Sequence, residues 1–122
     1  ARGGKHWADG FEYSGGNELK KVGWYDDNSH RETNPVGLKR PNQLGIYDMT
    51  GNVWEWCWDW YDNSFYQNSP KENPLGPEKG GSRVYRGGSW GSDADYCRVA
   101  RRNVNTPAIS RHNLGLRLAR QL

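Results

Sequence analysis

Hydrophobic and polar residues alternate most clearly between positions 53 and 61. Four tryptophans recur there at a period of two, at Trp54, Trp56, Trp58 and Trp60. The residues between them are Glu55, Cys57 and Asp59. Strict alternation is typical of a β-strand, because successive side chains point to opposite faces. We predict a strand over 53–61 whose four indoles form core, since burial dominates the energetics of aromatic side chains. An exposed platform for a carbohydrate or peptide is the alternative.

The rest of the chain shows short apolar runs separated by long polar stretches. Three further strands are expected, over residues 21–25, 82–86 and 114–119. Residues 26–29, Asp-Asp-Asn-Ser, are typical of a turn. The stretches 62–82 and 91–113 show no period and are predicted to be long loops, which in compact domains are usually functional or mobile. We find no convincing helix, no repeat and no second domain.

Composition decides between a disordered chain and a folded one. The chain has 122 residues, 34% of them hydrophobic, and a mean hydropathy of −1.09, values that alone would suit disorder. Seven Trp and seven Tyr argue against disorder, because each large aromatic side chain buries much surface. Sixteen Gly indicate many tight turns. We therefore predict one loop-rich globular domain with an aromatic core.

Charge and hydropathy exclude two classes of partner. The formal net charge is +3, and the Lys and Arg residues are scattered along the chain. A nucleic-acid partner is not expected, since it would require basic residues gathered on one face. No apolar stretch approaches the roughly 20 residues of a membrane span, and no signal peptide is visible. The compartment stays open.

The cysteines and histidines form no metal-binding pattern. Cys57 and Cys97 are the two cysteines, and they stand in no CxxC motif and at no zinc-like spacing from a histidine. Two separate buried thiols are the favoured interpretation, and a single disulfide between them is the alternative. His6, His30 and His112 are isolated in turn-rich sequence and are expected at the surface.

Several ordered motifs carry a family resemblance. Residues 42–56 read NQLGIYDMTGNVWEW, residues 86–90 read RGGSW, and the segments RVARR and LGLR follow at 98–102 and 114–117. Together with ARGG at 1–4, this series resembles the formylglycine-generating-enzyme, or sulfatase-modifying-factor, family. The resemblance implies an α+β variant of the C-type lectin fold, loop-rich with short antiparallel strands and little helix. Because the domains of that family are longer, residues 1–122 are expected to be the C-terminal part of one such domain.

The resemblance also implies a calcium site at the turn before the tryptophan strand. The matching positions are Asp48, Gly51, Val53 and Glu55. Calcium takes several oxygen ligands, which carboxylates and the carbonyls of a Gly-rich turn can supply. The alternative is that the Glu55 carboxylate pairs with an arginine near the C-terminus, such as Arg98 or Arg117.

An oxidase site is not expected, although the family includes oxidases. The formylglycine-generating enzymes use two cysteines shortly after the Gly-Gly-Ser segment to hold Cu(I), and they use O₂ to convert a substrate cysteine to an aldehyde. Thiolates suit Cu(I) because both are soft. Here Ser89 matches an active-site serine, but residues 90–96 contain no cysteine. Copper is therefore not expected. A sulfoxide-synthase iron site is not expected either, since its histidines would come from a separate helical domain.

The segment 91–113 is the candidate binding surface. Variable proteins of diversity-generating retroelements share the family fold and diversify this segment, so the resemblance implies a displayed surface on a bacterial or phage protein, with export left open. The candidate contact residues are Trp90, Ser92, Asp93, Asp95, Tyr96, Asn103, Asn105, Ile109 and His112. Mixed aromatic and polar side chains are typical of binding loops, and an ordinary polar loop is the alternative. We predict a non-catalytic module for a protein or small-molecule ligand, with a formylglycine-generating oxidase as the alternative.

Overall fold

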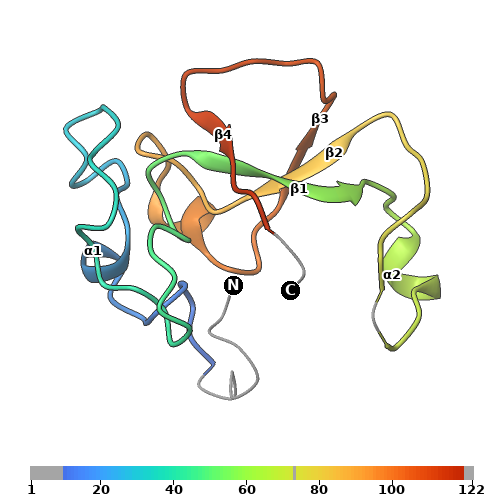
Figure 1. Ribbon diagram of the computed structural model, residues 1–122, viewed down its shortest axis with the longest axis horizontal. Coiled ribbons are helices and arrows are strands. Elements are labelled where there is room, and N and C mark those ends of the chain that lie inside the picture. Colours follow the sequence, from blue (N-terminus) through green and yellow to red (C-terminus); the bar gives the residue numbers. More distant parts are fainter. Residues whose placement is uncertain (1–9, 73, 120–122) are drawn as a thin grey trace.

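A small twisted sheet runs through the middle of the computed structural model, which describes residues 10–72 and 74–119 (Figure 1). Its four strands lie in the order β3-β2-β1-β4. They are β1 (Trp54–Trp60), β2 (Arg83–Arg86), β3 (Asn103–Asn105) and β4 (Leu114–Leu116). β1 pairs antiparallel with β2, and β2 antiparallel with β3, whereas β4 is parallel to β1. The prediction of a loop-rich fold with short, mostly antiparallel strands is confirmed.

Three of the strands were expected from the hydrophobic pattern and one was not. β1, β2 and β4 fall within the predicted ranges 53–61, 82–86 and 114–119. β3 lies inside the stretch that was predicted to be irregular. Its sequence, Asn-Val-Asn, offers a single β-branched residue, so its conformation depends on the pairing of Val104 with Val84 rather than on local propensity.

The helices are single turns: α1 (Leu19–Val22), α2 (Phe65–Asn68) and the 3₁₀ turn η2 (Ala94–Cys97). The predicted strand over 21–25 is wrong. Leu19 and Val22 stand three residues apart, so one turn of helix buries both on the same side. The predicted turn at 26–29 is confirmed, since the N–H groups of Asn28 and Ser29 both donate to the Tyr25 carbonyl. No helix in the described ranges is long and apolar enough to cross a membrane.

The tryptophan stripe of β1 does not stay on one buried face. Trp54 is buried, and the Trp54 and Trp56 rings meet the Tyr85 ring edge-on at centroid distances of 5.1 and 5.4 Å. Trp58 is 79% exposed, so the prediction that all four indoles form core is wrong for this residue. The register between β1 and β2 shifts between Trp56 and Trp60, and such irregularities bend and twist a strand. The second half of β1 therefore leaves the core, and the Trp58 ring lies 5.0 Å from the Arg83 guanidinium.

A cluster of buried side chains lies beside the sheet, among the loops on the left of Figure 1. It consists of Tyr13, Leu19, Val22, Tyr25 and Cys97. Two of these five are aromatic, so the core is mixed rather than mainly aromatic. Because Cys97 ends η2, the cluster joins the N-terminal loops to the segment that carries most of the candidate binding residues.

The turn before β1 is bonded through its backbone to two distant segments, one at Trp24 and one at residues 87–90. The Gly51 N–H donates to the Gly87 carbonyl at 2.7 Å, and the Asn52 N–H donates to the Trp24 carbonyl at 2.7 Å. The Asn52 carbonyl accepts from the Trp90 N–H at 2.8 Å. Both turn residues have positive φ, +74° at Gly51 and 64° at Asn52. Glycine is required at position 51 because an added Cβ would collide with the Trp24 backbone.

We expect Gly51→Ala to lower the free energy of unfolding by more than about 2 kcal/mol, because the new methyl group adds a backbone clash to a strained positive φ. The measurement is urea denaturation followed by tryptophan fluorescence. Gly91→Ala is the matched control, since a Cβ there meets no atom within 4 Å, and we expect it to change the unfolding free energy by less than about 0.5 kcal/mol. Equal effects of the two substitutions would contradict the assigned role of Gly51.

Candidate functional site

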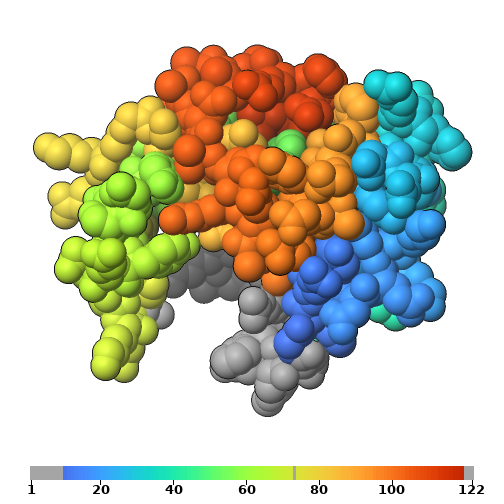
Figure 2. Space-filling model, turned by 180° about the vertical axis from the view of Figure 1, so that it is seen from behind, coloured from blue at the N-terminus to red at the C-terminus, as the bar shows by residue number. Residues whose placement is uncertain are grey.

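The predicted binding segment forms one continuous face of the molecule. Figure 2 shows its orange and red-orange atoms across the centre and top of the view. The two ends of the segment meet, since the rings of Trp90 and His112 lie 5.5 Å apart and are tilted by 36°. The Trp90 backbone is held on both sides, because its N–H donates to Asn52 and its carbonyl accepts from the Ser29 hydroxyl at 2.7 Å. The segment is thus anchored where it begins.

The 3₁₀ turn η2 presents three of the predicted contact residues in fixed positions. The Asp93 carboxylate caps the turn by accepting from the Tyr96 N–H at 3.3 Å. The Asp95 carboxylate pairs with Arg98 at 3.0 Å. The Tyr96 ring meets the Trp54 ring edge-on at 6.4 Å, and the Arg101 guanidinium lies 4.2 Å from its centroid. Each of the three side chains is exposed and is also restrained by a neighbour.

Ser92 differs from the other predicted contact residues because it is 9% exposed. Its hydroxyl accepts from the Ser89 N–H at 3.0 Å and lies 3.1 Å from the Ser89 hydroxyl. Ser89 itself is 1% exposed, and its hydroxyl accepts from the Asn113 side chain at 3.3 Å. The two serines therefore support the segment from inside.

The remaining predicted contact residues lie at and after β3. Asn103 and Asn105 are half-buried on this edge strand, and the Asn105 side chain accepts from the Thr106 N–H at 2.9 Å. Ile109 is half-buried in the loop that follows. Asn103 also lines a recess of about 380 Å³ with Tyr61, Tyr85, Arg102 and Val104. Sequence reasoning missed Arg102 and the two tyrosines, since they come from three separate segments with no shared pattern.

The four predicted calcium residues line one hollow. Asp48, Gly51, Val53 and Glu55 face a space of about 700 Å³ together with Arg117. Both Glu55 oxygens accept from the Arg117 guanidinium, at 3.0 and 2.7 Å, and the Asp48 carbonyl accepts a third bond at 3.0 Å. This pairing raises the pKa of Arg117. The structure therefore contains the ion pair that was the alternative to calcium, with Arg117 as the partner.

These donors suit a hard cation only in part. The carboxylates and turn carbonyls are oxygen ligands of the kind that calcium takes. However, the Glu55 charge is already matched by Arg117, and the Asp48 carboxylate accepts from the Gly37 N–H at 2.8 Å. Within residues 10–72 and 74–119, no three His, Cys, Asp or Glu side chains gather at a distance suited to a metal ion. Calcium at this hollow stays a prediction, and it would have to share Glu55 with Arg117 or displace it.

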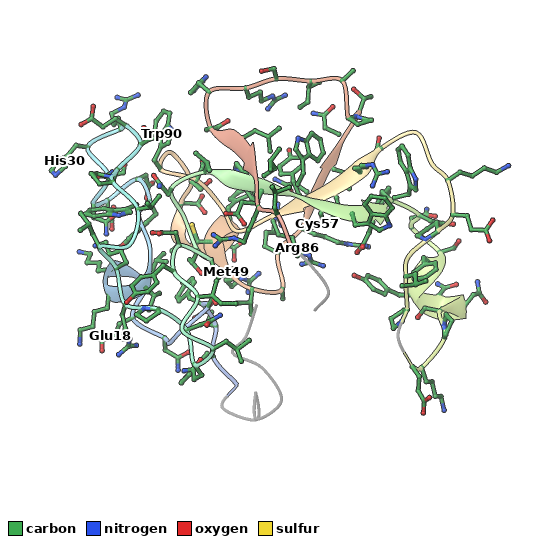
Figure 3. All side chains as sticks on the ribbon, viewed as in Figure 1. Glu18, His30, Met49, Cys57, Arg86 and Trp90 are labelled. Carbon is green, nitrogen blue, oxygen red and sulfur yellow. The ribbon has the colours of Figure 1, made fainter. Side chains whose placement is uncertain are left out.

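The two thiols are unbonded, yet they face the same cavity. Cys57 and Cys97 line an apolar space of about 210 Å³ with Met49 and Val99. Figure 3 shows Cys57 and Arg86 close together at the middle of the sheet. Burial raises the pKa of the Cys57 thiol, against the opposing effect of Arg86, and raises the pKa of the Cys97 thiol to about 12. Both groups are protonated at neutral pH and are therefore poor nucleophiles.

Native Cys97 is expected to react slowly with iodoacetamide. With a pKa of about 12, roughly one thiol in 10⁴ is ionised at pH 8, and the thiolate is the reactive form. Mass spectrometry should show that Cys97 is alkylated at least about a hundredfold more slowly in the native protein than in urea. In the native protein Cys57 should react before Cys97, because Cys57 is less buried. Since the folded pKa is raised, this thiol's contribution to stability is present below its ordinary pKa and is lost as the pH rises toward 12. Rapid native alkylation of Cys97 would contradict the assignment.

Comparisons with known proteins support this description of the scaffold. Over 96 residues the chain is 47% identical to the formylglycine-generating enzyme of Streptomyces coelicolor, covering 76% of this chain and 31% of the enzyme. It is 42% identical over 117 residues to the serine/threonine-protein kinase Pkn1 of Chlamydia trachomatis, covering 93% of this chain and 18% of the kinase.

The structure resembles Treponema denticola variable protein 1 with a TM-score of 0.80 and 40% sequence identity, covering 95% of this chain and 41% of that one. The chain therefore spans less than half the length of each of these three relatives. The sequence model of one protein family, the sulfatase-modifying factor enzyme 1-like domain, matches residues 1–122 of this chain. ARGG at 1–4 and His6 lie outside the described residues, whereas the motifs at 42–56, 86–90 and 114–117 include residues of β1, β2 and β4. The chain belongs to the sulfatase-modifying factor enzyme 1-like domain family.

Proposed function

We propose that the chain is a non-catalytic module that binds a protein or small-molecule ligand through the face formed by residues 91–113 together with Trp90. The observation that carries this proposal is the way the segment is held. Its ends meet at Trp90 and His112, and η2 is capped by Asp93, so the exposed side chains start from a fixed backbone. Preorganised loops lose less entropy on binding than flexible ones. The similarity to the variable protein supports the same conclusion.

The alternative function is that of a formylglycine-generating oxidase. The 47% identity to the Streptomyces enzyme favours it. Against it stands the absence of cysteine at residues 90–96, after Gly88 and Ser89. The two thiols that the chain does have are kept protonated by burial. A copper-thiolate site would need cysteine ligands at that position, so we favour binding over oxidation.

One pair of measurements separates the two functions. A peptide containing Cys-x-Pro-x-Arg, incubated with the protein, Cu(I) and O₂, should keep its cysteine when analysed by mass spectrometry. Peptides selected from a phage-displayed library against the immobilised protein should lose at least about tenfold in affinity for Trp90→Ala, because tryptophan is enriched among binding hot spots. Trp58→Ala is the matched control, since Trp58 is highly exposed but lies outside the segment. Formylglycine in the peptide would establish the oxidase instead, and binders insensitive to Trp90→Ala would contradict the assigned face.

Calcium at the Glu55 hollow is a second, separate proposal, tested on stability. We expect Ca²⁺ at a hundredfold excess over its Kd to raise the free energy of unfolding by about 2.7 kcal/mol, because it binds the folded state alone. Glu55→Ala should abolish the increase, whereas Glu78→Ala, an exposed carboxylate outside the hollow, should not. The measurement is thermal melting with calcium and with a chelator. Identical melting curves under both conditions would sink the proposal.

A further inference from the structure

An unusual arginine lies at the edge of the candidate binding face. The Arg102 guanidinium is 5.1 Å from the Tyr61 ring centroid and 4.4 Å from that of Tyr66, so two aromatic rings fix its position. In the described part of the chain it has neither a hydrogen bond nor an ion pair, whereas Arg98 and Arg117 each pair with a carboxylate. A guanidinium has five N–H donors and binds carboxylates in a planar, two-bonded geometry. The two rings therefore hold the Arg102 guanidinium in place, while its N–H donors have no hydrogen-bond acceptor among the described residues.

Two carboxylates that line a cavity together with this arginine do not pair with it. Asp59 and Asp62 line the neighbouring cavity, which Arg102 also lines. Neither forms an ion pair with Arg102 within the described ranges. One Asp62 oxygen already accepts from both the N–H and the hydroxyl of Ser64, at 2.7 and 2.6 Å. On its other side, Arg102 lines the open recess with Tyr61, Tyr85 and Asn103.

The recess adjoins an unpaired strand edge. β3 is the last strand of the sheet on its side, so its outer backbone groups have no strand partner among the described residues. Val104, at its centre, is 37% exposed. An added strand would lie about 4.8 Å from β3. Every second side chain of that strand would lie on the same face of the sheet as Tyr85 and Asn103, which are paired across β2 and β3. A side chain on that face would point toward the recess that Arg102 lines.

We propose that the β3 edge binds an extended peptide segment of a partner protein, and that Arg102 holds an acidic side chain of this segment in the recess between Tyr61 and Tyr85. The backbone edge supplies affinity without regard to sequence, and the recess supplies the preference for a carboxylate. Charge complementarity selects this occupant, since the recess is lined by a cation and by no anion. The inference rests on the proposed binding function and adds the chemical class of its partner.

The test uses three synthetic peptides and the whole chain. The probe is acetyl-Thr-Val-Glu-Val-Thr-amide, the second peptide replaces Glu by Gln, and the third replaces both Val residues by Pro, which disfavours strand pairing. Calorimetry should give the acidic peptide at least about tenfold tighter binding than the Gln peptide, the usual value of a charge-assisted hydrogen bond. The Pro peptide keeps the carboxylate but should also bind at least about tenfold more weakly, because its backbone cannot pair with β3. Its addition should shift the NMR signals of the Asn103–Asn105 amide groups.

Matched protein variants locate the effect. Arg102→Gln should abolish the preference for Glu over Gln, and Arg102→Lys should keep part of it, which guards against a variant that merely unfolds. Arg31→Gln, at an exposed arginine outside both the candidate binding face and the recess, should leave all three affinities unchanged. Equal affinity for the acidic and neutral peptides, or a preference that survives Arg102→Gln, would overturn the proposal. If no peptide binds while library-selected ligands still require Trp90, this inference fails and the proposed function stands.

Discussion

The backbone of Gly51 and Asn52 holds together parts of the chain that have little regular structure of their own. Their hydrogen bonds reach Trp24 on one side and Gly87 and Trp90 on the other. The Asn52 side chain adds a reciprocal pair with the Asn34 backbone, at 2.9 and 3.1 Å. Because the described helices are single turns, these hydrogen bonds, rather than helix packing, hold the segments together. Each buried backbone group satisfied here also avoids the cost of leaving a donor unpaired.

The same turn connects β1 to the candidate binding segment. β1 begins two residues after Asn52, and the candidate surface begins at Trp90, whose N–H is bonded to Asn52. A change in this turn would therefore displace the sheet and the surface together. The far end of the segment is tied to the sheet as well, because the Asn113 carbonyl accepts from the Trp54 N–H at 2.8 Å and the Asn113 side chain donates to the Ser89 hydroxyl at 3.3 Å.

The sequence was most informative where local pattern and tertiary structure agree. Alternation predicted β1 and short apolar runs predicted β2 and β4, because these strands form the middle and one edge of the sheet. The pattern failed at Trp58, where a register shift turns the strand outward, and at β3, which is defined by its neighbour. The Glu55–Arg117 pair was one of two anticipated pairings, since an arginine near the C-terminus was the natural counter-charge. The Arg102 recess had no local signal, because residues distant in the chain create it.

The loop from β3 to β4 crosses the whole sheet, as the upper part of Figure 1 shows. These strands are the two edges, so the loop must cover three strand spacings, roughly 14 Å. Four extended residues would reach about that far, and residues 106–113 are twice as many. Apart from Asn113, whose side chain donates to the Ser89 hydroxyl, substitutions can therefore change the chemistry of this loop while its ends stay fixed by the strands. Shortening it below about five residues would instead pull on the sheet, so evolution is free to vary its composition more than its length.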